Sequence, residues 1–419
     1  INNNFTHVTA RAHPCIVTAA LTRVVMDLPK VKAVVSLVLA LTLKKRIRRK
    51  RWVKQWLLKR ELYTHLNLLN EIQLTTEVDD YKNYFRMGKK CFDELLQMIT
   101  PYISKQDTCM RKSITPEEKL AVTLRYLATG RNIEDLKYSA LMSPAAITES
   151  IKVTCQTLIY VLKDYMKSKW LEIAKSFDMK ANFPHCLGAV DGKHIRVVKP
   201  NNSGSMYFNY KDYFSFVLLA VVDSEYRFIF ISVGSYGKEC DSSIFKESTM
   251  WKKLNDGSLN IPKPRPLHAT LQNDMPYVLV GDEAFPLSTN LLRPFGGTHL
   301  DYKKKIFNYR LSRARRYVEC AFGILANKWR ILHRPLDVHP DTAIEIVKAC
   351  TVLHNFVREK DGLNFEDIHY AAENPMQEHV QLPNCNPRGG PIANDIRSEF
   401  ANYFVSTIGS VPWQPEAHV

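Results

Sequence analysis

The chain has 419 residues, which is too long for one ordinary domain and suits two or three. Hydrophobic residues make up 45% of it, enough to bury a sizeable core, and the net charge of +16 favours a polyanionic partner such as nucleic acid or an anionic membrane surface. The nine cysteines form no CxxC pair and no zinc-finger spacing, which argues against a structural zinc site and against a disulfide framework.

Residues 1–43 match no pattern that we recognise and are treated as an N-terminal extension. Within them, residues 33–43 are apolar for eleven positions, short of the roughly 20 needed to span a bilayer. Charged residues follow this run rather than a small-residue cleavage site, so a signal peptide is not indicated. We therefore expect no membrane association, and a membrane anchor at residues 33–43 remains the alternative.

A strongly basic segment follows. Residues 44–60 (KKRIRRKRWVKQWLLKR) contain ten lysines or arginines. One interpretation is a nuclear-import signal or an arm that binds DNA phosphates. The other is the solvated face of a first helix whose tryptophans point inward. Both interpretations are compatible with one segment.

Residues 44–180 are predicted to combine this basic arm with an all-helical domain, in which residues 81–100 carry apolar side chains at helical spacing and are predicted to be helical. The sequence Thr115-Pro116-Glu117-Glu118 is typical of a helix start with a capping box, and Gly130 is a typical helix end. A short helix over 133–139 and a longer one beginning at Ser143-Pro144 complete a helix-turn-helix candidate. The first exposed positions of the third helix, Thr148, Glu149 and Lys152, are not strongly basic, so a plain packing domain is an equal alternative.

Residues 181–360 change to an α/β pattern. Short apolar or β-branched runs over 186–191, 213–222, 226–233 and 277–281 predict strands, the second and third forming a hairpin. Helices are predicted over 241–254, 308–332 and 341–358, with Asp241 capping the first. This order suits a mixed sheet with helices on its faces. Beyond residue 360, proline and asparagine accumulate, and we predict a weakly ordered tail over 361–419.

Three carboxylates stand where chemistry could use them. Asp191 ends the first predicted strand, Asp282 ends the fourth, and Glu319 lies in the long helix. Acids at the ends of neighbouring strands emerge at one edge of a sheet, where α/β proteins place their sites. Mg²⁺ and Mn²⁺ prefer such hard oxygen ligands, and two metals can assist both ends of a phosphodiester displacement. Singly, each acid could instead be a turn residue, a helix cap or the ion-pair partner of a neighbouring arginine.

Basic residues crowd the start of the same helix, where they could contact the DNA backbone or simply form a solvated face. His194, Asp223, Asp241 and Glu283 are weaker site candidates. No glycine-rich nucleotide loop occurs, so no small-molecule cofactor is expected. The candidate DNA-binding residues are Lys303, Lys304, Arg310, Arg313, Arg315 and Arg316.

The motifs around these residues resemble one family. They include GAVDGKHIRV (188–197), VGDEAFPL (280–287), NYRLSRARRYVECAFGILANKWRIL (308–332) and CTVLHNFVRE (350–359), and similarity extends upstream over 107–130. The order and length of these stretches are similar to those of the PIF/Harbinger transposases and the Harbinger-derived nucleases. One departure is Glu283, which stands where many members have a small residue after the aspartate.

This resemblance implies a ribonuclease-H-like catalytic domain with an Asp-Asp-Glu triad that binds Mg²⁺ or Mn²⁺. By motif, the triad falls on Asp191, Asp282 and Glu319, with 36 residues between the last two. The resemblance further implies DNA as substrate, action in the nucleus with the cytoplasm left open, and a separate Myb-like DNA-binding partner. The expected function is a metal-dependent DNA endonuclease derived from a transposase. A catalytically silent DNA-binding or adaptor protein is the alternative.

Overall fold

The computed structural model describes residues 53–74, 78–109, 112–166, 169–362 and 389–414. The chain divides into two compact units, Ile1–Leu58 and Lys59–Val419. The elements described below belong to the second unit, except for the first residues of η1, which belong to the first unit. Most of the basic segment 44–60 and all of the apolar run 33–43 lie outside the described residues. In the described part, no helix combines the length and the apolar character that crossing a membrane requires.

The chain begins with a series of helices. They are η1 (Gln55–Lys59), α3 (Arg60–Tyr63), α4 (His65–Leu74), α5 (Val78–Phe85), α6 (Lys89–Ile103), α7 (Pro116–Thr129), α8 (Ile133–Ala140), α9 (Pro144–Val161), η2 (Lys163–Met166) and α10 (Trp170–Ala181).

Local capping explains where the helices of the predicted helix-turn-helix begin and end. Both hydrogen bonds of the capping box between Thr115 and Glu118 are present at the start of α7, and Gly130 ends this helix with φ of 64°. Ser143 caps α9 by accepting a hydrogen bond from the amide of Ala146. These helix limits confirm the sequence prediction, whereas reading of DNA by α9 stays a prediction.

One predicted helix is divided. The hydrophobic periodicity of residues 81–100 indicated a single helix, but α5 ends at Phe85 and α6 begins at Lys89. Arg86 between them has φ of 63°, a left-handed conformation that interrupts the helical hydrogen bonds. The apolar face continues across the break, which is why periodicity alone did not reveal it.

The sheet has five strands in the order β3-β2-β1-β6-β7. The long strand β1 pairs antiparallel with β2 and parallel with β6, and β7 is parallel to β6. The predicted hairpin is confirmed as β2 and β3. The bounds are β1 (Cys186–Arg196), β2 (Ser215–Val222), β3 (Phe228–Tyr236), β6 (Val278–Val280) and β7 (Leu291–Leu292), with a separate pair β4 (Arg265–Pro266) and β5 (Asp274–Met275).

The remaining helices follow the third strand. They are α11 (Asp241–Glu247), α12 (Thr249–Asn255), α13 (Tyr302–Lys328), η3 (Arg330–His333), α14 (Pro340–Asp361) and α16 (Pro391–Val405). The single helix predicted over 241–254 is broken at Ser248, whose side chain caps α12, and Cys240 rather than Asp241 is the N-cap residue of α11. The long helix begins at Tyr302, earlier than predicted, because Asp301 caps it by accepting from the amide of Lys304.

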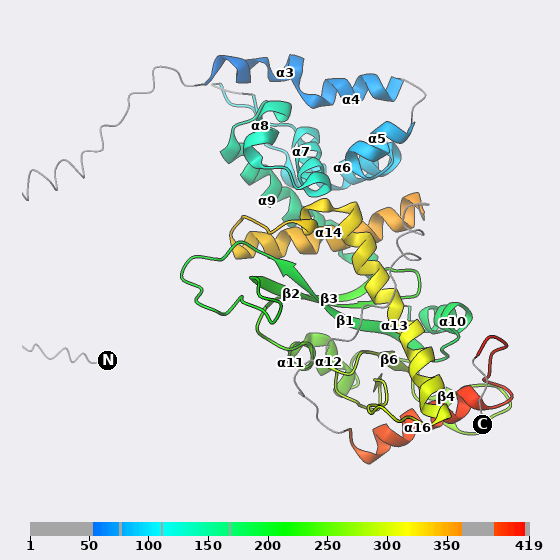
Figure 1. The fold of residues 1–419 in the computed structure, drawn as a ribbon. Helices are drawn as coiled ribbons and strands as arrows, with labels where there is room; N and C mark the ends of the chain where they lie inside the picture. Colours follow the sequence, from blue (N-terminus) through cyan, green and yellow to red (C-terminus); the bar gives the residue numbers. More distant parts are fainter. Residues whose placement is uncertain (1–52, 75–77, 110–111, 167–168, 363–388, 415–419) are drawn as a thin grey trace, which may run out of the picture. The chain divides into compact units, whose positions relative to one another are not determined.

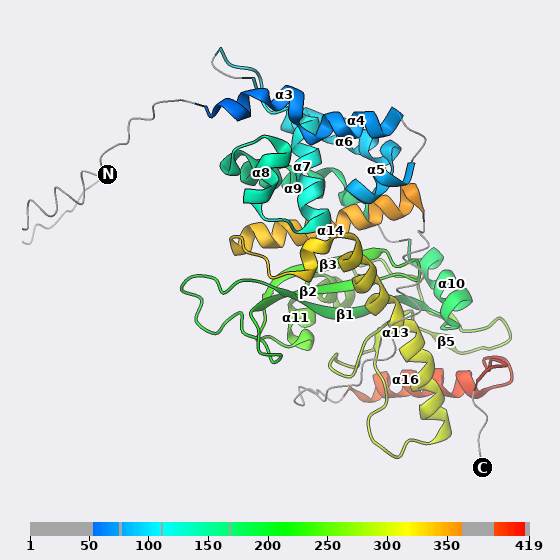
Figure 2. The ribbon, with the colours of Figure 1, turned by 45° about the horizontal axis from the view of Figure 1, so that its top comes forward.

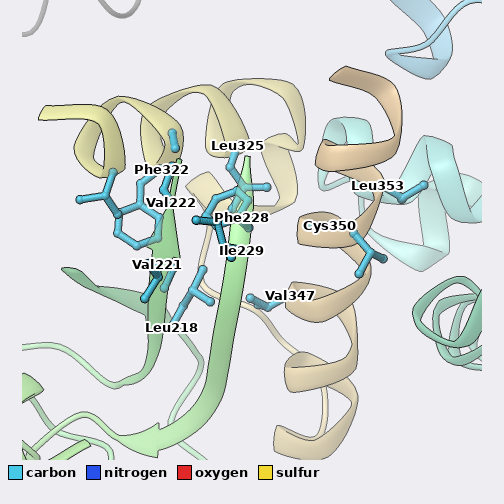
Figure 3. Close-up of a cluster of buried hydrophobic side chains, with 14 of the residues drawn as sticks. Leu218, Val221, Val222, Phe228, Ile229, Phe322, Leu325, Val347, Cys350 and Leu353 are labelled. Carbon is cyan, nitrogen blue, oxygen red and sulfur yellow. The ribbon is translucent and has the colours of Figure 1, made fainter. Parts of the chain in front are cut away.

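Helices α13 and α14 cover the hairpin of the sheet (Figures 1 and 2). In Figure 3, side chains of β2 and β3 lie close to Phe322 and Leu325 of α13 and to Val347 of α14. Buried side chains of the N-terminal helices belong to the same continuous hydrophobic core. The division at residues 180/181 into a helical and a catalytic domain therefore remains a prediction, although it falls between α10 and β1.

The C-terminal prediction needs correction. A weakly ordered tail was expected over 361–419, yet Pro391–Val405 is the helix α16 and packs on α13. Phe400 and Phe404 are fully buried. Because the proline-rich and asparagine-rich residues before this helix dominated the composition, they hid the helical spacing of its apolar residues. Residues 363–388 lie outside the described part.

Candidate active site

The pairing of two strands brings two aspartates next to each other. In the parallel register of β1 and β6, Ala189 lies opposite Val280, and Asp191 and Asp282 each follow two residues later. The prediction that Asp191 ends its strand is wrong, because β1 continues to Arg196 and pairs with β2 over that length. Asp191 therefore lies inside β1, beside the edge where β6 ends and Asp282 follows. Both carboxylates also accept a local backbone hydrogen bond, Asp191 from Gly192 and Asp282 from Ala284, each at 2.9 Å.

Helix α13 supplies the third predicted acid. Its buried residues Val318, Ala321 and Phe322 face the core, which leaves Glu319 on the exposed face with its side chain 48% accessible. α13 packs against β1, which carries Asp191, against β6, which precedes Asp282, and against β2. The helix thus places Glu319 over the part of the sheet where Asp191 and Asp282 lie.

Arg315 lies between the first and the third acid. One turn before Glu319 on α13, its guanidinium forms an ion pair with the Glu319 carboxylate. The same nitrogen is 3.8 Å from Oδ2 of Asp191. The ion pair that we considered as an alternative explanation for Glu319 is therefore present. It also connects Glu319 to Asp191, and the Arg315 side chain is only 12% exposed.

Several carboxylates lie close together in this site, and their charges affect one another's protonation. Burial raises the pKa of Asp191 to about 7; Arg315 opposes this shift, while Asp282 and Glu319 add to it. Burial disfavours the charge of Arg315, but Asp191, Glu319 and Asp282 outweigh it and hold its pKa above the ordinary value. Asp282 and Glu319 thus lie close enough to Asp191 to disfavour its negative charge.

A fourth acid, Asp241, joins them. Burial, together with the charges of Asp191 and Asp282, raises its pKa to about 8. Its carboxylate lies over Gly192, so closely that a Cβ at position 192 would come within 2.2 Å of Oδ1. Sequence reasoning had ranked Asp241 among the weaker candidates and as a helix cap. Its place at the start of the helix after β3 was the signal that could have raised its rank.

The other weaker candidates have different roles. Asp223 is buried in the hairpin turn, where it accepts from the amides of Glu225 and Arg227 and pairs with the Arg227 side chain. Glu283 is exposed. His194 shares a hydrogen bond of 2.9 Å with the Ser215 hydroxyl, and burial lowers its pKa to about 4. It is therefore neutral near pH 7.

The four acids offer only oxygen donors, the type that Mg²⁺ and Mn²⁺ prefer, and they repel one another unless cations offset their charge. By donor chemistry, they fit a divalent metal. In the described part of the chain, however, no three His, Cys, Asp or Glu side chains are arranged so that they could hold one ion. Ligation would thus require side-chain rotation, most directly of Glu319, which is engaged by Arg315.

One predicted DNA contact is wrong. Arg310 is only 2% exposed, and its Nε donates to the carbonyl of Asn182 at 3.1 Å. Its guanidinium also lies 4.6 Å from the ring of Phe404. Arg310 is a structural residue because α10 and α16 cover this part of α13, which the helix sequence itself does not reveal.

The other basic residues of α13 differ in their environment. Lys303 and Arg316 are exposed, and Lys304 pairs with Asp301 at 2.9 Å. Arg313 lies over the ring of Trp413 at 4.0 Å. Their contact with DNA stays a prediction, whereas Arg315 belongs to the acidic cluster.

Comparison with known proteins gives matches over the same region. A family model described as DDE superfamily endonuclease matches residues 190–355. The chain is 24% identical to "Protein ALP1-like" of Arabidopsis thaliana over 315 residues, covering 72% of this chain and 76% of the relative. It is 22% identical to "Putative nuclease HARBI1" of Rattus norvegicus over 302 residues, covering 70% and 81%. The Xenopus laevis protein of the same name is 20% identical over 327 residues, covering 75% and 88%.

No solved structure matches the chain with significance. The resemblance predicted from the sequence motifs is confirmed by the family model and the curated relatives.

Proposed function

This chain is related to the DDE superfamily endonucleases and the Harbinger-derived nucleases, and from that premise we propose that it hydrolyses DNA with the help of divalent metal. The single observation that carries the proposal is the gathering of four acids: Asp191 and Asp282 follow paired strand positions, Arg315 joins Glu319 to Asp191, and Asp241 packs on Gly192. Acids that crowd together in this way favour the binding of cations.

The sheet supports a ribonuclease-H-like domain. Three antiparallel strands in the order β3-β2-β1 continue into the short parallel strands β6 and β7, with α13 packed across them. The long central strand β1 carries Asp191, Asp282 follows its parallel neighbour β6, and α13 carries Glu319. This is the arrangement that the Asp-Asp-Glu assignment requires.

We assign the metal to Asp191, Asp282 and Glu319, with Asp241 as a further oxygen donor. Bound Mg²⁺ or Mn²⁺ would activate water and stabilise the leaving oxygen of the phosphodiester. Arg315 is a positioning residue, because its ion pair holds Glu319 near Asp191. Asp241, packed on Gly192, limits how far the Asp191 backbone can shift.

DNA is the proposed substrate. The net charge of +16 and the exposed cations Lys303 and Arg316 near the start and middle of α13 suit a phosphate backbone. Action in the nucleus, help from a Myb-like DNA-binding partner, and DNA reading by the helices α7, α8 and α9 are parts of the same proposal. Each rests on the family resemblance or on the sequence pattern.

The test is metal-dependent nicking of supercoiled plasmid DNA by the purified full chain. We expect Mg²⁺ or Mn²⁺ to be required and Glu319→Gln to lower the rate on the order of 100-fold or more, because the lost carboxylate acts on the transition state. Glu283→Gln is the matched control, since this exposed acid lies one residue from Asp282, and it should cleave like the unaltered chain.

A catalytically silent DNA-binding or adaptor protein is the second candidate. One observation favours this candidate: the Glu319 carboxylate forms an ion pair with Arg315, so it is not available to bind a metal in this conformation. This candidate predicts DNA binding without cleavage and no difference between Glu319→Gln and the unaltered chain. Equal nicking by both proteins, or none by either, would reject the hydrolytic proposal.

A further inference from the structure

The connection between β1 and β2 carries a group of exposed aromatic side chains. We call residues 198–214 the aromatic loop; it is the green connection between these strands in Figure 1. Tyr210 is 52% exposed, Phe208 39% and Met206 37%. Neither the triad nor the packing of the core uses these faces. An exposed aromatic group of this kind usually marks a binding surface.

The loop is held in one conformation by buried polar groups. Asn209 is only 3% exposed, and its amide nitrogen donates to the Ser215 hydroxyl at 2.8 Å. Its side-chain oxygen accepts from the amide of Lys211 at 2.9 Å, and the amide of Ser215 donates to the Tyr207 carbonyl at 2.7 Å. The aromatic rings are therefore presented by a hydrogen-bonded frame, which lowers the entropy lost when a ligand binds.

The frame is connected directly to the catalytic strand. His194, three residues after Asp191 on β1, shares a hydrogen bond of 2.9 Å with the Ser215 hydroxyl. The His194 ring also meets the Tyr210 ring edge-to-face, with centroids 5.4 Å apart. The position of Tyr210 is thus coupled to the strand that carries the first acid of the triad.

Cations accompany the rings. Lys211 Nζ lies 5.4 Å from the centre of the Tyr210 ring, and Lys199 Nζ lies 5.4 Å from that of Phe214. Lys211 also lies near the carboxylate of Asp241. Asp212 is the loop's single acidic residue. The loop therefore offers aromatic faces and positive charge beside the acids.

This combination favours one class of ligand. Unpaired nucleotides bind to aromatic side chains by stacking, while neighbouring lysines contact their phosphates. Paired duplex DNA hides its base faces and would engage only the lysines. A second copy of this chain, whose net charge is +16, would bring repulsive charge to the same surface.

We propose that the aromatic loop binds unpaired nucleotides of the DNA strand next to the cleaved bond, with a base stacked on Tyr210. The inference rests on the proposed nuclease function for the identity of the strand. Phe208 provides a second stacking face, and Lys211 contacts the adjoining phosphate. The loop thereby directs the enzyme toward junctions, frayed ends or distorted sites rather than continuous duplex.

The test measures binding without metal, so that it does not depend on cleavage. Fluorescence anisotropy in EDTA would compare a fully paired duplex with the same duplex carrying a single-stranded extension. Tyr210→Ala should weaken binding of the extended DNA by about 5- to 100-fold and leave binding of the paired DNA nearly unchanged. Tyr210→Phe should retain the preference, because stacking needs the ring and not the hydroxyl.

Tyr102→Ala is the matched control. Tyr102 on α6 is likewise exposed, at 56%, but it lies outside the loop and outside the helices α7, α8 and α9. Its removal should leave the ratio between the two DNA affinities unchanged. A 2-aminopurine in the extension should also lose fluorescence on binding to the unaltered chain and not on binding to Tyr210→Ala.

Two outcomes would overturn the inference. One is an equal loss of affinity for both DNAs in Tyr210→Ala. The other is an unchanged ratio accompanied by a change in oligomeric mass, which would make the loop a contact between copies. If the preference for unpaired DNA is present but the unaltered chain cleaves no plasmid, the nuclease proposal fails while the binding site stands.

Discussion

Single residues of the acidic edge work as a group. Asp191 and Asp282 follow paired positions of β1 and β6, Glu319 comes from α13, and Asp241 is pressed against Gly192. Taken singly, each of these acids could be a turn residue, a helix cap or the partner of an arginine. Their chemistry arises from mutual proximity, because each carboxylate makes it harder for its neighbour to lose a proton unless a cation is present.

Asp241→Asn tests the fourth acid. Removing one of the carboxylates that face Asp191 and Asp282 weakens the attraction for a divalent cation, so we expect metal affinity or activity to fall about 10- to 100-fold. The measurements are the Mn²⁺ concentration at half-maximal nicking and the rise in Tm on addition of Mn²⁺. Glu247→Gln, an exposed acid on the same helix α11, is the control; equal behaviour of the two variants would remove Asp241 from the site.

At the scale of elements, two parts of α13 have different functions, and the sequence of the helix alone does not distinguish them. One part of its length presents Glu319 and Arg315 to the sheet edge, and an earlier part contacts α16. The buried guanidinium of Arg310 lies over the Phe404 ring and bonds to the end of α10. The helix that carries the third acid is therefore held in place by the last described helix of the chain.

Phe404→Ala tests whether α16 stabilises the fold. The ring is fully buried and contacts Phe183 with centroids 5.1 Å apart. We expect its truncation to cost about 3–5 kcal/mol of stability, measured by urea unfolding. Ile392→Ala on the same helix is the control, because its side chain is 67% exposed and its loss should change stability by less than about 0.5 kcal/mol. A weakly ordered tail would make both changes equally mild.

At the scale of the whole molecule, stability should depend on neutral buried histidines. Burial lowers the pKa of His65 to about 4, and burial holds that of His354 well below 6.5. The unfolded chain takes up protons on these groups as the pH falls below about 6.5, while the folded chain does not. Their contribution to stability is therefore full above pH 6.5 and is lost progressively toward pH 4.

His65→Leu tests this dependence. The shift at His65 corresponds to a loss on the order of 3 kcal/mol between pH 6.5 and 4, so the variant should lose correspondingly less stability over that interval than the unaltered chain. Urea unfolding at several pH values gives the two slopes. His339→Gln, whose imidazole is 74% exposed, should keep the slope of the unaltered chain, and identical slopes in all three proteins would contradict the prediction.

Much of the fold could be predicted from the sequence because its signals are local. The capping box at Thr115 and the left-handed end at Gly130 depend on neighbours within four residues, and they fell where predicted. The β2–β3 hairpin follows from two apolar runs around a short polar turn. Asp282 was likewise indicated by its place after a buried strand and Glu319 by its place in a periodic helix, whereas Asp191 lies inside β1 and not at the end of a strand as predicted.

The sequence by itself thus determined the positions of most helices and strands, the family relationship and the candidate triad. Only the tertiary structure decided that Arg310 is buried, that Asp241 joins the acids and that α16 completes the core. Arg310 bonds to Asn182, 128 residues away, and Asp241 approaches Gly192 from another element. Such roles depend on which surfaces the folded chain covers, and burial of a polar side chain is set by distant partners rather than by its neighbours in sequence.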